Sequence, residues 1–199
     1  MTYTEALEKI HGLLHFGSRP GLDRILKLLD LIGNPQDKCK FVHVAGTNGK
    51  GSVCQMISSV LTEAKYKTGL FISPFITDFR ERIQINGEMI PKQKLADIVE
   101  YIYPFVEQMA KNDEIITEFE FVNAIAFYYY YIEKCDIVVL APTLSLHHYA
   151  QLSHLLTLTI LLYLVIQSRK SLTKNVVLSR KTPTQSSVNK LTRKLKSKL

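Results

Sequence analysis

Hydrophobic residues along the first 140 positions alternate between helical spacing and short continuous runs. Helical spacing predicts five helices, at about residues 6–14, 22–32, 53–61, 92–111 and 118–133. Continuous apolar runs predict three buried strands, at residues 41–45, 69–73 and 136–140. The last run, Asp136-Ile137-Val138-Val139-Leu140, is typical of a strand inside a parallel sheet. Strands that alternate with helices in this way predict an α/β layered domain.

Turn and capping residues divide these elements. Glycine and proline at 17–21 and 33–35 predict turns on either side of the second helix. An extended polar loop is expected from Pro74 to about Gln84, followed by a turn at Asn86-Gly87. Thr117 begins T-E-F-E, a pattern that predicts a capped helix N-terminus.

A glycine-rich loop, within HVAGTNGKGS at residues 43–52, separates the first predicted strand from the helix after it. Backbone N–H groups at such a helix N-terminus can cradle phosphate oxygens. Lys50 adds a positive charge, and Ser52 or Thr47 offers a hydroxyl to phosphate or Mg²⁺. The loop therefore indicates a phosphate site.

The spacing within this loop departs from the common pattern G-x-x-x-x-G-K-[ST]. Only two residues separate Gly46 from Gly49, and Gly51 stands between the lysine and the serine. From the loop alone, an ordinary glycine and asparagine turn remains the alternative.

The amino-acid composition limits the kinds of protein that the chain can be. The 199 residues are 46% hydrophobic, which is enough to fill the core of one domain. The three cysteines show no paired spacing and no histidine cluster beside them, so we expect reduced thiols in the cytoplasm and neither disulfides nor a zinc site. The N-terminal segment MTYTEALEKI does not have the pattern of a secretory signal.

The net charge of +7 is distributed unevenly. Residues 1–140 hold 15 of the Lys and Arg residues and all 18 Asp and Glu residues, whereas residues 141–199 hold ten bases and no acid. All nine glycines and all nine phenylalanines also lie in the first 140 residues. Two kinds of sequence therefore meet near Leu140, and we expect one domain over 1–140 and a separate basic tail over 141–199.

Three segments of the first 140 residues carry a family resemblance. GTNGKGS at 46–52, SPF at 73–75 with the following FRERIQING, and TEFEFVNAIAF at 117–127 occur in this order. In these segments the chain resembles the folylpolyglutamate synthase and dihydrofolate synthase family, which is Mur ligase-like. The related Mur ligases share GTNGK but usually continue with threonine.

The resemblance implies an incomplete parallel sheet with flanking helices and an ATP-dependent ligase. Such a ligase phosphorylates the carboxylate of a folate or dihydropteroate and lets the amine of L-glutamate displace the phosphate. It implies ATP and Mg²⁺ as cofactors and a cytoplasmic monomer, without saying which folate is the acceptor. Neither nucleic acid nor a membrane is an expected partner.

The resemblance also implies site residues. The residues implied for ATP are Gly46, Thr47, Asn48, Gly49, Lys50, Gly51 and Ser52. Ser73 is implied for Mg²⁺. The residues implied for the folate or pteroate pocket are Ser18, Arg19, Pro20, Phe119, Glu120, Phe121 and Val122.

Simpler interpretations exist for several of these residues. Ser73 can merely end a strand before Pro74, and Glu120 can be part of a capped first turn. Phe119 and Phe121 lie two apart on a helix, so only one of them need face a ligand. The run of tyrosines at 128–131 points in all directions on a helix, and we expect it mostly to pack.

The resemblance stops after Leu140, where APTLSLHH replaces the family's glycine-rich continuation with its Mg²⁺-binding glutamate. Amino acids whose codons begin with G make up 43 of the first 140 residues but only 6 of the last 59. Back-translation of residues 164–181 with permissible codons, read from the third base, can spell LGDTIKKIAHEKCGIIKE, a family-like segment. These patterns indicate a frame change after Leu140, with a helical or disordered tail as its product.

Two other interpretations of the tail remain open. The apolar stretch 152–166 is shorter than the roughly 20 residues that span a bilayer, and the basic end KLTRKLKSKL lacks the aromatic residues typical of nucleic-acid binding. We expect a marginally stable, inactive piece of a ligase, with a non-catalytic nucleotide-binding or membrane-associated fragment as the alternative.

Overall fold

The computed structural model describes residues 1–14, 21–44, 49–141 and 158–160. The helices are α1 (Tyr3–His11), α2 (Asp23–Leu31), η2 (Pro35–Lys38), α3 (Lys50–Glu63), η3 (Phe79–Arg82), α4 (Lys92–Ala110) and α5 (Glu118–Ile132). The strands are β1 (Phe41–Val44), β2 (Thr68–Phe71), β3 (Ile83–Ile85), β4 (Glu88–Met89), β5 (Ile137–Leu140) and β6 (Leu158–Ile160). This content confirms the predicted α/β class, but β6 is a strand within residues 141–199, where a helical or disordered tail was expected.

One sheet with the strand order β4-β3-β2-β5-β1-β6 organises the chain. The pairs β2–β5, β5–β1 and β1–β6 are parallel, whereas β3 and β4 add an antiparallel hairpin at one edge. Strand β5 is buried between β2 and β1, in agreement with its continuous apolar run.

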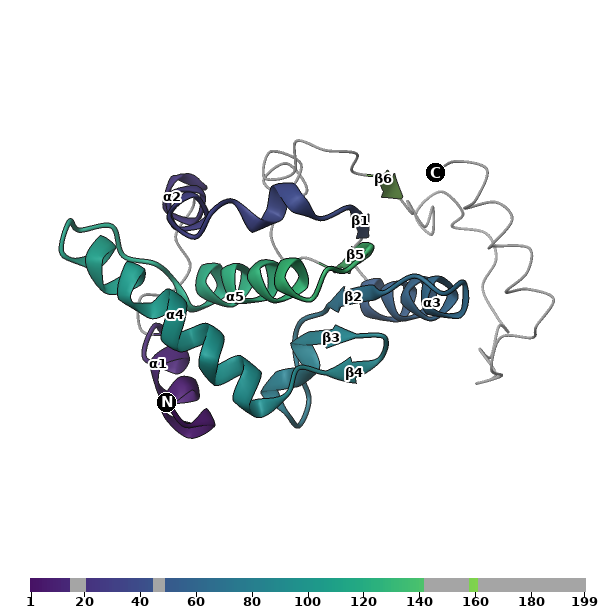
Figure 1. Cartoon of the computed structure of the whole chain (residues 1–199), viewed down its shortest axis with the longest axis horizontal. Coiled ribbons are helices and arrows are strands. Elements are labelled where there is room, and N and C mark those ends of the chain that lie inside the picture. The colour runs from purple at the N-terminus through teal and green to yellow at the C-terminus, as the bar shows by residue number, and fades with distance from the viewer. Residues whose placement is uncertain (15–20, 45–48, 142–157, 161–199) are drawn as a thin grey trace, which may run out of the picture.

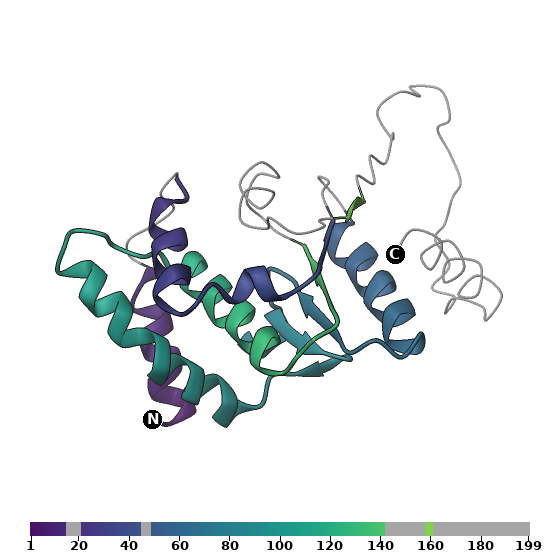
Figure 2. The same ribbon diagram turned by 45° about the horizontal axis from the view of Figure 1, so that its top comes forward.

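Alternate residues of the parallel strands face two separate parts of the core, because successive side chains of a strand point to opposite faces. Leu70 and Val139 pack with Cys54 and Leu61 of α3 on one face. Phe71, Phe41, Val138 and Leu140 pack with the helices on the opposite face. Figures 1 and 2 show α3 on one side of the sheet and α1, α2, α4 and α5 gathered on the other.

The second part of the core contains most of the buried helix residues. Helix α5 is buried along much of its length and lies among the other three helices on its side of the sheet (Figure 1). Tyr129 and Tyr130 are buried, Tyr128 stacks on Tyr101 with ring centroids 4.9 Å apart, and Tyr131 is exposed. The run of tyrosines therefore mostly packs, as predicted.

The segment expected to be a polar loop from Pro74 to Gln84 contains more structure than its sequence suggests. It ends in η3 and enters β3, which pairs with β2 so that Phe71 lies opposite Ile83. The predicted turn at Asn86-Gly87 is present, with positive φ at both residues, and it connects β3 to β4. The strand was missed because three residues are too few to show a hydrophobic period.

Candidate active site at the carboxyl edge of the sheet

The parallel strands β1, β5 and β2 end at the same edge of the sheet. His43 of β1 and Phe71 of β2 both lie opposite Leu140 of β5, and the amide of Ala141 donates a 2.9 Å hydrogen bond to the carbonyl of Phe71. Ligands of open α/β sheets bind outside this edge. The glycine-rich loop after β1 and Ser73 after β2 both leave the sheet here, so the structure brings these two predicted sites to one edge.

The described half of the glycine-rich loop forms the start of α3. Gly49 precedes the helix with a φ of 76°, a conformation that favours glycine, and its carbonyl accepts the first helical hydrogen bond, from Val53. Gly49, Gly51 and Ser52 are exposed, and Lys50 is partly buried. Gly46, Thr47 and Asn48 lie outside the described residues.

The electrostatics of this helix start suit an anion. Helix α3 is 14 residues long, and its first turn carries no acidic residue to compete for the free N–H groups. The thiol of Cys54, one turn into the helix, has its pKa raised to about 12 by burial, with the charge of Lys50 acting in the opposite direction. Cys54 therefore stays neutral and adds no negative charge at this end of α3.

Ser73 lies two residues beyond β2 and is partly buried, and its peptide bond to Pro74 is cis. The loop that follows is held by the carboxylate of Glu81. This carboxylate accepts hydrogen bonds from the backbone N–H groups of Ile76, Thr77 and Asp78 and from the hydroxyl of Thr77. These four donors lower the pKa of Glu81 to about 2, so the loop is fixed by an ionised group.

The residues expected in the acceptor pocket occupy different environments at the start of α5. Phe119 is partly buried, with its ring 6.5 Å from that of Phe71, whereas Phe121 and Val122 are fully buried core residues. Of the two phenylalanines, Phe119 is therefore the one available to a ligand. Ser18, Arg19 and Pro20 lie outside the described residues.

Glu120 stabilises the start of α5. It forms the predicted reciprocal capping box with Thr117, in which its carboxylate accepts hydrogen bonds from the N–H and hydroxyl of Thr117. The same carboxylate accepts a 3.0 Å hydrogen bond from Arg24 of α2, and its side chain is only 6% exposed. The simpler interpretation of Glu120 as a helix cap therefore describes its contacts in this structure.

Two residues of this edge escaped the sequence interpretation. Glu81 could have been found, because D-F-R-E at 78–81 has the form of a capping box, which the structure contains. Arg24 had no such signal, since it lies 96 positions away from Glu120. Only the packing of α2 beside α5 brings these two side chains together.

Candidate metal ligands are sparse in the described part of the chain, which holds no group of three or more His, Cys, Asp or Glu side chains suited to a metal ion. The hydroxyl of Ser73 is a hard oxygen donor of the kind that Mg²⁺ accepts, and this ion usually keeps water and phosphate oxygens as its other ligands. The hydroxyl of Ser73 therefore suits a Mg²⁺ ion that is also bound by the phosphates of a nucleotide.

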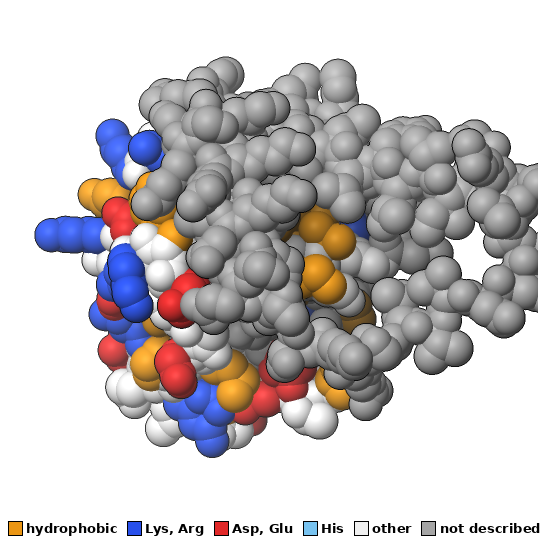
Figure 3. Space-filling model, turned by 90° about the vertical axis from the view of Figure 1, so that its right-hand side faces the viewer, with side chains coloured by type: hydrophobic (Ala, Val, Ile, Leu, Met, Phe, Trp, Pro, Cys, Tyr) orange, Lys and Arg blue, Asp and Glu red, His pale blue; other side chains and the backbone are white. Residues whose placement is uncertain are grey.

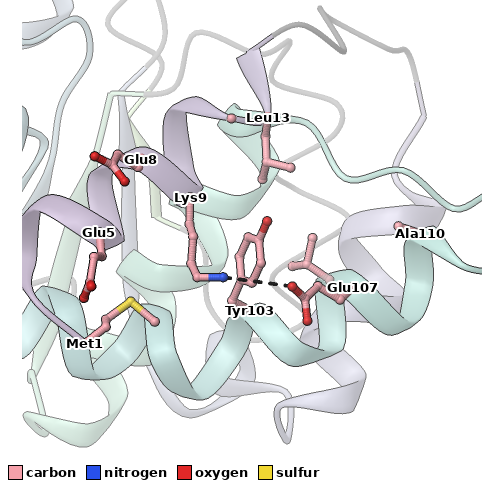
Figure 4. A pocket seen from close by; sticks show the side chains of 10 residues that line it. Met1, Glu5, Glu8, Lys9, Leu13, Tyr103, Glu107 and Ala110 are labelled. Carbon is pink, nitrogen blue, oxygen red and sulfur yellow. Dashed lines mark ion pairs between the residues drawn. The ribbon is translucent and has the colours of Figure 1, made fainter.

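A groove of about 740 Å³ lies elsewhere, between α1 and α4. Figure 4 shows Lys9 between these helices, beside the ring of Tyr103 and paired with Glu107. Its lining residues come from α1, its flanking residues and α4, so it is separate from the carboxyl edge.

One face of the described structure carries charged side chains of both signs. Figure 3 shows Lys and Arg side chains interspersed with Asp and Glu on the described part of one face. Within the ranges that the structure describes, no helix is long and apolar enough to cross a membrane. The apolar stretch 152–166 and the basic end lie, apart from β6, outside those ranges.

No family model matches the chain, but individual proteins and solved structures do. It is 42% identical over 139 residues to the dihydrofolate synthase/folylpolyglutamate synthase of Bacillus subtilis, a match that covers 69% of the chain and 32% of that protein. The crystal structure of folylpolyglutamate synthase (FPGS) from Thermotoga maritima matches 71% of the chain and 33% of its own length, with a TM-score of 0.67 and 38% identity. A solved complex of FPGS with AMPPCP and folate matches 70% of the chain and 35% of its own length, with a TM-score of 0.65 and 39% identity.

Over about 70% of its length the chain is homologous to the folylpolyglutamate synthase/dihydrofolate synthase family. The chain spans about a third of the length of the curated relatives that it matches, corresponding to their N-terminal portion.

Proposed function

We propose that residues 1–140 form the nucleotide-binding domain of a ligase that joins L-glutamate to a folate or dihydropteroate. The observation that supports this most is the placement of Gly49, Lys50 and Ser73 at one carboxyl edge of the sheet. One edge can therefore hold a nucleotide and its metal ion. A relative of 39% identity has been solved with a nucleotide analogue and folate together.

The start of α3 would hold the phosphates. The free N–H groups of its first turn point out of the N-terminal end of the helix, where they can donate to phosphate oxygens. Lys50 would neutralise part of the phosphate charge. Gly46, Thr47 and Asn48 would complete the loop, and Gly51 and Ser52 would lie beside the phosphates. When bound, ATP and Mg²⁺ supply the activated phosphoryl group for the acceptor's carboxylate.

Ser73 would contribute one oxygen ligand to Mg²⁺. Its position is supported by the loop that Glu81 holds, because that loop begins directly after the serine. The acceptor would lie at the start of α5 beside Phe119, and Ser18, Arg19 and Pro20 are the further residues that the family resemblance implies for it. In this arrangement Glu120 supports the pocket through the capping box and does not itself bind the acceptor.

Most of residues 141–199 would lie outside the ligase domain, although β6 pairs with β1 in its sheet. They contain no Asp or Glu, so this sequence offers no carboxylate after β5 to share the metal ion with Ser73. We therefore expect the chain as it stands to bind nucleotide without completing glutamate transfer. Sequencing of DNA and transcript across codons 130–185 tests the frame change: an uninterrupted frame that restores a family-like continuation supports it.

Nucleotide binding by the full chain is the direct test. We expect Lys50→Met to weaken binding of Mg²⁺-AMPPCP by about tenfold to a hundredfold, the loss typical of one charge-assisted contact. Lys65→Met, which changes an exposed lysine just beyond the other end of α3, is the matched control and should bind normally. Equal binding by both variants and the unaltered chain would exclude this phosphate site.

Ligation is measured separately, as ATP-dependent addition of glutamate to dihydropteroate or folate. We expect no product from this chain alone. Formation of product would show that residues 1–199 suffice for the reaction. It would contradict the proposal that the chain cannot complete glutamate transfer with residues 141–199 as its C-terminal part. Failure to bind nucleotide at all would instead contradict the proposed domain function.

A further inference from the structure

The groove between α1 and α4 combines an apolar floor with carboxylates on both of its sides. Leu13, just after α1, and Val106 of α4 belong to its lining and are 6% and 3% exposed. Glu5 and Glu8 line it from α1 and Glu107 lines it from α4, and all three side chains are exposed. Such a surface suits an amphipathic segment that carries positive charge beside an apolar face.

Negative charge is in excess among the side chains of this groove. Hydrogen bonds from the backbone and the side chain of Thr2 lower the pKa of Glu5, so its carboxylate is ionised. The lysine of the lining, Lys9, lies 3.8 Å from the ring centroid of Tyr103, with its Nζ atom 3.9 Å from a carboxylate oxygen of Glu107 (Figure 4). The N-terminal ammonium is paired with a carboxylate of α4. The positive groups at the groove therefore have partners, and carboxylates of α1 remain for an incoming cation.

The C-terminal segment 188–199 has the matching sequence pattern. The apolar residues that recur in it at helical spacing are Val188, Leu191, Leu195 and Leu199. The segment also contains five Lys and Arg residues and no Asp or Glu. At the rise of a helix, residues 191–199 would span about 12 Å, which equals the span of residues 5–13 along the groove. The segment itself lies outside the described residues, so this match is one of sequence to surface.

The connecting chain is long enough to bring this segment to the groove. Strand β6 ends at Ile160, and the about 28 residues from there to Val188 can extend to about 90 Å. A domain of about 140 residues has a radius of gyration of only about 14 Å. A flexible tether also gives an effective concentration of about a millimolar, so an intrinsic affinity of about 1 mM is enough to fill the groove half of the time.

We propose that residues 188–199 bind the groove between α1 and α4 of the same chain. The leucines of the segment lie on the apolar floor, and its basic side chains lie beside the carboxylates of the groove. This contact buries apolar surface and pairs opposite charges at once, which is how amphipathic helices bind grooves. The inference goes beyond the proposed function and does not depend on it, because the groove is separate from the carboxyl edge of the sheet.

Carbodiimide crosslinking of the full chain tests this contact. The reagent couples a lysine amine to a carboxylate that touches it, and mass spectrometry of the monomeric product locates the amide bond. We expect lysines of the segment 188–199 to be joined to Glu5, Glu8 or Glu107. The ion pair of Lys27 and Glu114 lies outside the groove lining and should crosslink in every variant, which standardises the yield.

Matched variants separate a specific contact from random collisions. Leu195→Asn places a polar group on the apolar stripe and should lower the yield of groove crosslinks by about fivefold or more. Ser197→Asn introduces the same residue on the opposite side of a helix and should leave the yield unchanged. Glu8→Lys should lower the remaining groove crosslinks by repulsion, whereas Glu63→Lys, which changes an exposed carboxylate at the end of α3, should not.

Equal yields from Leu195→Asn and Ser197→Asn would overturn the inference, as would crosslinks spread over carboxylates of the other helices without preference for the groove. Crosslinks of mixed mass from isotope-labelled and unlabelled chains would show that the groove holds the segment of a second copy, which overturns the contact within one chain. An absence of groove crosslinks together with binding of the full chain to phosphatidylserine vesicles would replace the groove by a membrane. Binding of Mg²⁺-AMPPCP is measured separately, so the proposed function is tested independently of all these outcomes.

Discussion

The hydroxyl of Tyr130 in α5 donates a 2.7 Å hydrogen bond to the backbone carbonyl of Leu70 in β2. Tyr130 is fully buried, and burial raises the pKa of its hydroxyl well above the usual value, so the group remains a donor. Its ring lies over Gly69, the residue before Leu70. This contact fixes α5 on the central strand whose end leads to Ser73.

Tyr130→Phe removes this hydrogen bond with little change of shape. We expect the free energy of unfolding to fall by about 0.5–1.5 kcal/mol, since a buried hydrogen bond is lost. Urea denaturation of the full chain measures the change. Tyr131→Phe, at an adjacent residue that is 43% exposed, is the control and should stay within about 0.5 kcal/mol. Equal effects of the two substitutions would contradict a specific role for the contact.

Gly69→Ala tests the close approach of α5 to β2. A Cβ atom at this position would lie 2.8 Å from Cδ1 and 2.9 Å from Cε1 of Tyr130, and 3.1 Å from Cγ2 of Val138. All three contacts belong to packed side chains, so we expect a loss of about 1–3 kcal/mol in the free energy of unfolding. At Gly51 in α3, no atom of the described residues lies within 4 Å of an added Cβ, so Gly51→Ala should instead stabilise by about 0.5–1 kcal/mol. A stable Gly69→Ala variant would mean that Tyr130 can move.

Arg24→Met tests the ion pair that joins α2 to α5. The substitution leaves the carboxylate of Glu120 buried without this partner, and we expect a loss of about 1–3 kcal/mol in thermal or urea unfolding. The control is Lys27→Met, which breaks a pair with Glu114 whose side chains are 49% and 34% exposed, and about 0–1 kcal/mol is expected.

A second variant identifies the cause of that loss. Arg24→Met combined with Glu120→Gln removes the buried charge, while glutamine can still complete the capping box. We expect the double variant to recover part of the lost stability. A double variant less stable than Arg24→Met would show that the cap requires the ionised carboxylate.

The pH dependence of stability tests the loop after Ser73. The pKa of Glu81 is lowered to about 2 in the folded chain from an ordinary value of 4.5, so its ionised form stabilises the fold. Its contribution is fully present above about pH 4.5 and is lost as the pH falls toward 2. We expect the unaltered chain to lose more stability than Glu81→Gln over this range.

Denaturation at pH 6, 4 and 3 measures this difference. The lowered pKa values of Glu5, Asp78 and Glu133 affect both proteins in the same direction, so the comparison isolates Glu81. Glu63→Gln, at an exposed residue, should follow the unaltered chain. Parallel pH profiles for Glu81→Gln and the unaltered chain would show that its hydrogen bonds do not persist in solution.

Local patterns in the sequence were sufficient for the main elements. The helix predicted over 118–133 was confirmed as α5, with the capping box at Thr117 and Glu120, because both signals lie within a few residues of each other. The buried strand at 136–140 was confirmed for the same reason, since its apolar run is continuous. The strand β3 was not foreseen, because its pairing with Phe71 spans the loop between them.

The sequence by itself determined the helices, the buried parallel strands, the glycine-rich loop and the change of composition near Leu140, since each depends on residues close together in the chain. Only the tertiary structure decided that Phe121 is buried while Phe119 stays partly exposed, and that Arg24 binds Glu120. It also left the Nε and Nη1 atoms of Arg82 without an acceptor from the described residues, with the guanidinium beside the ring of Phe75. A helical period fixes the face on which a side chain lies, but its neighbours come from distant segments and are chosen by packing.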